Sequence, residues 1–194
     1  MRRLSRPLAV IAALALVAAT TAAAQRPQTR QGFWIGFGFG SGSAGLSCDG
    51  CGSIDRDGAL SGYLKLGGTL SRQLLLGAET NGWTKRIQGS TVTLANASVA
   101  AYFYPRPAGG LFVRGGVGLA AYSEEGFNSE KGFGLTLGLG YDVRVGTNVS
   151  ITPVGNVSWG SIGYAHVARI PGAGMGVTGL KQNVIQIAVG VTFH

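Results

Sequence analysis

The sequence has 194 residues, a length typical of one domain. Only 12% of them are charged, about half the share of an ordinary soluble domain, and 34 are glycine. With six prolines and no Gly-X-Y repeat, collagen is excluded, and a positive mean hydropathy excludes a disordered chain. The net charge is +8, but the basic residues are scattered, which argues against nucleic-acid binding. The composition favours a chain whose solvent is partly lipid.

Residues 1–24 are typical of a secretory signal peptide. Arginines at its start are followed by a short uncharged apolar run and then by alanines that supply a cleavage site of small side chains. An uncleaved membrane helix is the alternative, but the apolar run is short for a span. After cleavage, a short segment (25–31) would precede the folded domain, which we expect over residues 32–194.

From Gly32 onward, apolar residues recur at every second position, which is the period of a β-strand with one apolar face. In the clearest run, Phe133 and Leu135 begin an apolar row, and small or polar residues fill the alternate positions. We predict eight strands, over residues 32–42, 59–70, 74–84, 91–104, 110–122, 131–144, 148–160 and 181–193. These lengths suit strands that cross a bilayer at a tilt, which need ~9–11 residues.

The connections between these runs are predicted to alternate in length. The short ones are 71–73, 105–109 and 146–147, and the others, mostly longer, are 43–58, 85–90, 123–130 and 161–180. Membrane barrels have short periplasmic turns and longer outer loops. We therefore expect both chain ends in the periplasm and four loops outside the cell.

The polar residues within the runs predict which face lines the lumen. An eight-stranded barrel is only just wide enough inside for side chains to fill it. The face rich in glycine, alanine, serine and threonine fits such a lumen, so the large apolar face should meet lipid. Pro153 falls within a run and cannot donate to a strand ladder, so we expect a bulge there.

Aromatic rings on the outward face fall toward the two ends of the predicted strands. Aromatic side chains favour both membrane interfaces. The predicted girdle consists of Phe33, Phe39, Phe103, Phe133, Tyr141, Trp159 and Phe193.

With these alternating runs, the signal peptide and the connections, the chain resembles the small outer-membrane β-barrel family of the OmpA, OmpX and OmpW kind. The last run also looks like the sorting signal read by the barrel-assembly machinery, at Gly190, Val191 and Phe193. The resemblance covers residues 32–194 and implies an all-β fold, an eight-stranded antiparallel up-and-down transmembrane barrel. It implies the outer membrane of a Gram-negative-type bacterium, with membrane lipid, lipopolysaccharide and the assembly machinery as partners.

The sequence Cys48-Asp49-Gly50-Cys51 is the most conspicuous local motif. A second cysteine pair for a structural zinc site is missing, as is the context of a thioredoxin-like redox motif. Because exported proteins fold in an oxidising compartment, a disulfide between Cys48 and Cys51 is the favoured interpretation. Free thiols and a metal site remain the alternatives.

Lys65, Glu79, Arg114 and Asp142 are all predicted to point into the lumen. A charge in a narrow lumen is costly unless it is paired. The family resemblance implies an ion-pair network that plugs the barrel. A gated or selective pathway past these residues is the alternative.

No catalytic site, metal site or cofactor is expected. The two histidines, His166 and His194, fall in a loop and at the periplasmic end, away from a suitable nucleophile and acid. We therefore favour a structural or surface-interaction protein whose barrel anchors four extracellular loops for a ligand not identified by the sequence. A narrow channel for ions or small solutes is the alternative, and a lipid-modifying enzyme ranks last.

Overall fold

The computed structural model describes residues 30–50, 52–87, 89–165 and 176–194. The predicted signal peptide lies outside these residues. Within them, no helix is long and apolar enough to cross a membrane. The strands are β1 (Phe33–Cys48), β2 (Gly52–Thr69), β3 (Leu74–Ile87), β4 (Ser90–Phe103), β5 (Leu111–Glu124), β6 (Glu130–Tyr141), β7 (Val143–Arg144), β8 (Val149–Ala165) and β9 (Val177–Phe193).

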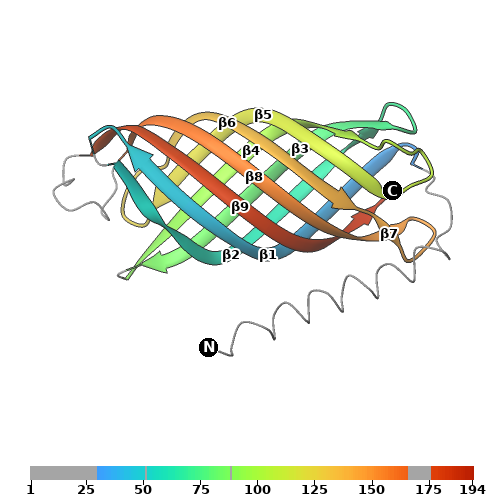
Figure 1. The fold of residues 1–194 in the computed structure, drawn as a ribbon, viewed down its shortest axis with the longest axis horizontal. Coiled ribbons are helices and arrows are strands. Elements are labelled where there is room, and N and C mark those ends of the chain that lie inside the picture. The colour runs from blue at the N-terminus through green and yellow to red at the C-terminus, as the bar shows by residue number, and fades with distance from the viewer. Residues whose placement is uncertain (1–29, 51, 88, 166–175) are drawn as a thin grey trace, which may run out of the picture.

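Apart from β6 and β7, strands that follow one another pair antiparallel, and β1 also pairs with β9, which closes the sheet into a barrel (Figure 1). The β8 strand pairs with both β6 and β7, which are two parts of one strand interrupted at Asp142. The prediction of an eight-stranded antiparallel up-and-down barrel is therefore confirmed.

The two ends of the barrel differ. One end, the short-turn end, carries residues 70–73, 104–110 and 145–148, together with Arg30 and His194. It lies on the right in Figure 1, where the C-terminus is marked. The opposite end, the loop end, carries residues 49–50, 89 and 125–129, together with the end of β8 at Ala165 and the start of β9 at Val177.

The two faces of the wall follow the predicted alternation. In β6, the Leu137 side chain is 56% exposed on the outer surface, whereas Thr136 beside it is 1% exposed. The polar residues predicted inward are all buried, and the large apolar side chains of the other face are exposed. The prediction of which face lines the lumen is therefore confirmed.

The strands extend further toward the loop end than predicted. For example, β1 continues to Cys48 and β2 begins at Gly52, so most of the predicted loop 43–58 is strand. The connections predicted at 43–58, 85–90 and 123–130 are therefore shorter than expected, and residues 166–175 of the predicted connection 161–180 lie outside the described residues. In these extensions the alternation inverts: outward positions such as Ser43 are polar, and inward positions such as Leu46 are buried and apolar.

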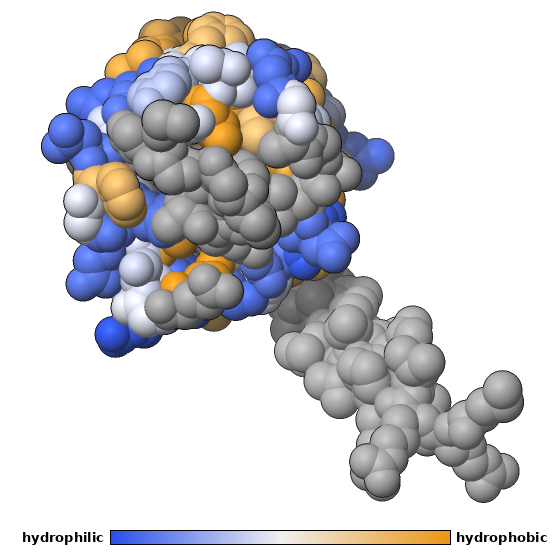
Figure 2. Space-filling model, turned by 90° about the vertical axis from the view of Figure 1, so that its left-hand side faces the viewer, coloured by the Kyte–Doolittle hydropathy of each residue, from blue (hydrophilic) through white to orange (hydrophobic). Residues whose placement is uncertain are grey.

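Because of this inversion, the part of the barrel wall beyond the lipid-facing apolar band has a polar outer surface. Seen from the loop end, hydrophilic residues surround much of the rim (Figure 2). A strand whose outer face is polar is suited to water rather than to lipid tails. The strand extensions therefore carry the connections away from the apolar band.

Large aromatic side chains fill the lumen, and their inward position was not predicted from the sequence. At the short-turn end, Trp34, Tyr102, Phe112 and Tyr104 form a chain of ring contacts with centroids 5.1–5.8 Å apart. Glycines of the neighbouring strands make room for them: a Cβ at Gly67 would lie 2.6 Å from Cζ2 of Trp34. This aromatic group belongs to a buried set, the turn-end cluster, of Trp34, Tyr63, Leu75, Ala100, Tyr102, Tyr104, Phe112, Val154 and Ala188.

A second buried apolar set closes the loop end of the lumen. It contains Trp83, which donates a hydrogen bond from Nε1 to the carbonyl oxygen of Gly42 at 3.1 Å. We call it the loop-end cluster: Ala44, Leu46, Cys48, Trp83, Val92, Leu94, Ala120, Tyr122, Ile162, Ala165, Leu180 and Val184. Polar side chains lie between the two clusters.

The bulge predicted at Pro153 is not found, because Pro153 pairs with Val189 in continuous register. On its other side, the pairing of β8 with β6 ends at Val154 and resumes with β7 at Ile151. Pro153 thus lies in the gap between these two pairings, next to the interruption at Asp142, so the irregularity falls in the partner strand. A proline is tolerated there because that ladder is already broken.

Candidate functional site

An ion pair crosses the middle of the lumen. Arg114 of β5 donates from Nη1 to Oε2 of Glu79 on β3 at 2.6 Å, and both side chains are buried. Tyr102 of β4 donates its hydroxyl to the same carboxylate oxygen, and Arg114 Nη2 donates to Asn81 Oδ1 at 3.2 Å. Charge-assisted bonds of this kind are the strong ones in a low-dielectric interior.

Amide side chains extend this ion pair to the opposite wall. Asn156 of β8 donates from Nδ2 to Asn81 Oδ1 at 3.3 Å and to Gln186 Oε1 of β9 at 2.8 Å. The polar layer therefore joins five strands across the lumen, β3, β4, β5, β8 and β9. The cavity beside it measures about 10 Å³, which is room for no more than one water molecule.

Lys65 is in register with Glu79 but lies in a different environment. Its Nζ is 5.1 Å from the ring centroid of Phe112 and 5.5 Å from that of Tyr102. No ion pair within 4.0 Å joins Lys65 to another described residue. Aromatic faces attract cations electrostatically, so the turn-end cluster provides the neighbours of this buried ammonium.

Asp142 lies at the short-turn end, apart from Arg114. Tyr104 and Thr152 donate hydroxyl hydrogen bonds to its two carboxylate oxygens, each at 2.8 Å. Arg30 Nη2 lies 3.7 Å from Oδ2, and His194 Nε2 lies 3.6 Å from it. Burial and the nearby Asp142 charge raise the pKa of Tyr104 well above its ordinary value, so Tyr104 stays a donor.

Arg30 is a residue that the sequence analysis missed. Its guanidinium carbon lies 3.4 Å from the ring centroid of Tyr104. It donates hydrogen bonds to the carbonyl oxygens of Pro107 at 3.1 Å and Gly109 at 2.7 Å. The side chain is buried and covers the lumen at the short-turn end. The four charges predicted as one network therefore lie in three environments, of which Arg114 and Glu79 share one.

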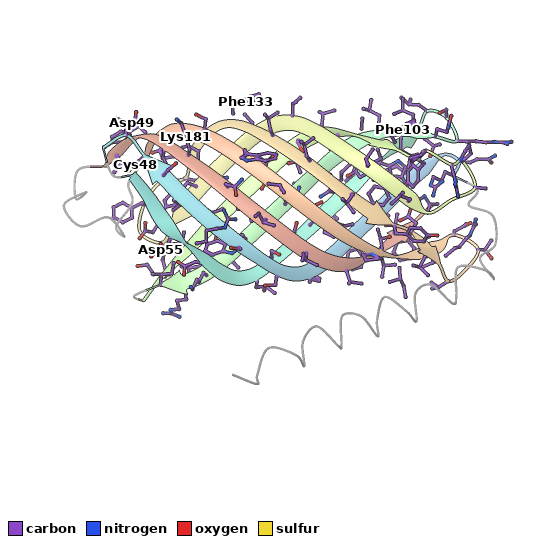
Figure 3. The ribbon with its side chains drawn as sticks, viewed as in Figure 1. Cys48, Asp49, Asp55, Phe103, Phe133 and Lys181 are labelled. Atoms are coloured by element: carbon purple, nitrogen blue, oxygen red, sulfur yellow. The ribbon has the colours of Figure 1, made fainter. Side chains whose placement is uncertain are left out.

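The predicted girdle and assembly-signal residues lie on the wall. Among the described residues, the predicted girdle rings other than Tyr141, which is half-buried, are exposed on the outer surface, from Trp159 at 41% to Phe39 at 68%. Phe103 points outward near the short-turn end and Phe133 nearer the loop end (Figure 3). Gly190 and Val191 lie in β9 opposite Gly38 and Phe37 of β1, so they belong to the pair of strands that closes the barrel.

Cys48 is the last residue of β1, and it is not a free cysteine in the structure. Cys51 lies outside the described residues, so the disulfide stays a prediction. Within the described residues, no three His, Cys, Asp or Glu side chains are grouped to hold a metal ion. His166, the loop histidine weighed as a catalytic base, also lies outside them.

We expect the purified, non-reduced protein to show no reactive thiol toward maleimide in denaturant, because the two cysteines are only three residues apart in an oxidising compartment. Mass spectrometry after labelling checks this. Reduction before labelling is the control and should expose both thiols. Two labelled cysteines without reduction would contradict the disulfide.

The sequence profile described as "Outer membrane protein beta-barrel domain" matches residues 10–193. The fold is similar to the crystal structure of Neisserial surface protein A, with a TM-score of 0.52, 15% identity, and coverage of 86% of this chain and 99% of that one. It is also similar to Ail, the attachment invasion locus protein of Yersinia pestis, with a TM-score of 0.52, 12% identity, and coverage of 85% and 100%. No curated protein matches the sequence. At such identities, the likeness shows the fold alone.

Proposed function

Because the chain belongs to the outer-membrane β-barrel family and lies in the outer membrane of a Gram-negative bacterium, we propose that it is a membrane-anchored scaffold. In this proposal, the barrel holds four connections on the cell surface for structural or adhesive contacts. Its lumen is not a route for solutes.

The observation that carries the proposal is the filled lumen. The Arg114–Glu79 ion pair and its amide partners cross the middle of the barrel, and an apolar cluster lies on either side. Arg30 covers the short-turn end of the lumen. A solute would have to break a buried ion pair, which leaves an uncompensated charge and costs about 3–5 kcal/mol.

The strand extensions also support a surface role. They continue the hydrogen-bonded wall beyond the outer girdle to the strand ends from which the outer connections start. Contacts made on rigid elements lose less conformational entropy than contacts made on free loops. We also propose that the closing strand, with Gly190, Val191 and Phe193, is read by the assembly machinery during insertion.

The test is planar-bilayer conductance of the refolded protein, and we expect no conductance steps. Altered gel mobility on heating shows that the protein is folded, and a known porin inserted by the same procedure shows that the assay reports open barrels. A stable, reproducible step from verified folded protein would contradict the proposal. It would favour a narrow channel lined by Arg114 and Lys65.

A further inference from the structure

A groove of about 580 Å³ opens on the outer wall near the loop end. It crosses β6, β8, β9, β1 and β2, which are neighbours in the closed sheet. Two cross-strand rows run through it. One row is Phe133, Ser161, Lys181 and Ser47, and the next is Leu135, Trp159, Asn183 and Gly45.

The apolar part of the groove belongs to the band that faces lipid. Phe133 and Trp159 are rings of the outer girdle, and Leu135 lies below Phe133 on β6. In Figure 3, Phe133 and Lys181 lie toward the loop end on the same side of the barrel. Because aromatic girdles mark the membrane interface, Lys181 lies at the height of lipid headgroups.

The second cation of the groove, Arg56, is placed there by a bulge. The register of β1 with β2 shifts between Ala44 and Leu46, so Asp55 and Arg56 stand opposite Gly45 alone. Such bulges redirect a side chain. The Arg56 side chain lies against Gly45, where a Cβ would come within 3.2 Å of its Nη1.

Hydrogen bonds hold the Arg56 guanidinium across two neighbouring strands. It donates from Nε to Ser43 Oγ at 3.1 Å and from Nη1 to Asn183 Oδ1 at 2.8 Å, and Nη2 donates to the Ser43 carbonyl oxygen. Because a guanidinium has five N–H donors, two remain for an anion. The side chain is thus oriented by neutral groups.

In the part of the chain that the structure describes, the charges of Arg56 and Lys181 are not neutralised by a carboxylate. Within the described ranges, no carboxylate lies within 4.0 Å of either cation, whereas Lys85 nearby pairs with Asp57 at 2.6 Å. Of the acids near Arg56 in the sequence, Asp57 is the one that pairs with Lys85, and Asp49 and Asp55 lie at the loop-end rim (Figure 3). The groove therefore combines an apolar floor with two cations that no carboxylate of the described residues pairs with.

We propose that this groove binds a phosphorylated glycolipid of the outer leaflet, the lipid A part of lipopolysaccharide. Its phosphate lies between Arg56 and Lys181, and one of its acyl chains lies along Phe133, Leu135 and Trp159. Charge complementarity selects the phosphate, and the position beside the outer girdle selects a lipid over a soluble anion. The proposal does not depend on whether the lumen conducts.

The test is native mass spectrometry of the refolded protein in detergent, titrated with bis-phosphorylated lipid A. We expect the Arg56→Gln/Lys181→Gln double variant to bind lipid A about tenfold more weakly than the wild type, because charged hydrogen bonds are lost. Arg86→Gln is the matched control. Arg86 is an exposed cation on β3, also near the loop end of the barrel but outside the groove. This control should bind like the wild type.

Three further arms decide the source and chemistry of the ligand. The wild type should bind dephosphorylated lipid A as weakly as the double variant binds bis-phosphorylated lipid A. Excess inorganic phosphate should not displace lipid A from the wild type, and phosphatidylglycerol should bind to the wild type more weakly than lipid A does. Altered gel mobility on heating confirms that each variant is folded. Equal binding by wild type and double variant, an equal loss in Arg86→Gln, or full binding of dephosphorylated lipid A would overturn the proposal.

Discussion

Replacing Arg114 by alanine is expected to lower the free energy of unfolding by about 3–5 kcal/mol, because Glu79 is left as a buried charge without its partner. Tyr102 would still donate to that carboxylate, but a hydroxyl does not neutralise it. Urea titration of the barrel in lipid vesicles, followed by tryptophan fluorescence and gel mobility, measures the change.

A double variant without either charge provides the control. The Glu79→Gln/Arg114→Met variant removes both charges, so it should lose less stability than Arg114→Ala alone. An Arg114→Ala protein as stable as the wild type would mean that the ion pair does not stabilise the folded barrel. The proposal of a sealed lumen would then lose its main support.

The Gly40→Ala substitution is expected to cost about 3 kcal/mol, at the upper end of what overpacking usually costs. A Cβ at this position would lie 2.0 Å from the carbonyl oxygen of Ile187 and 2.5 Å from the Cα of Ala188. Both atoms belong to the backbone of β9, so no side-chain rotation relieves the clash. Because β1 and β9 close the barrel, we expect a smaller fraction of protein in the fast-migrating folded band after refolding.

Gly82→Ala is the matched variant, since a Cβ at Gly82 meets no atom within 4 Å. It adds the same methyl group to a strand of the same barrel and should change the unfolding free energy by less than about 1 kcal/mol. If both variants refold equally well, close approach of the β1 and β9 backbones is not what requires glycine at position 40.

The strands and their faces could be predicted because the barrel wall is a single sheet with lipid on one side and the lumen on the other. Every second residue must be apolar, and in an antiparallel meander each strand pairs with the next. The 131–144 run illustrates this: its apolar row is the exposed face of β6 and β7, and its small residues lie in the lumen. Lys65, Glu79, Arg114 and Asp142 could be placed inward by the same alternation.

The partners of these charges could not be predicted, because contacts across a lumen join residues far apart in sequence. Arg30 precedes the first strand and carries no periodic signal, yet it reaches Asp142. A signal for the lumen rings was present in adjacent aromatic residues such as Phe33-Trp34 and Tyr102-Phe103. Because neighbours on a strand point to opposite faces, one ring of each pair must enter the lumen.

The strand extensions escaped prediction for a different reason. Above the apolar band, water replaces lipid as the outer solvent, so the apolar residues move to the inward positions and the pattern changes phase. Leu46 and Trp83 belong to this inverted pattern. The position of Arg56 depends on a bulge, which displaces the chain by one residue without leaving a clear periodic trace.

Asp142 brings together the two segments that flank the closing strands. Arg30 precedes β1 and His194 follows β9, and both approach the same carboxylate. His194 reaches Asp142 across β8 alone, but the Arg30 contact requires β1 and β9 to be side by side, so a partly inserted, open sheet lacks the Arg30 contact. Interactions absent from the transition state of folding act mainly by slowing unfolding. We therefore expect the Arg30–Asp142 contact to extend the lifetime of the finished barrel rather than to aid its insertion.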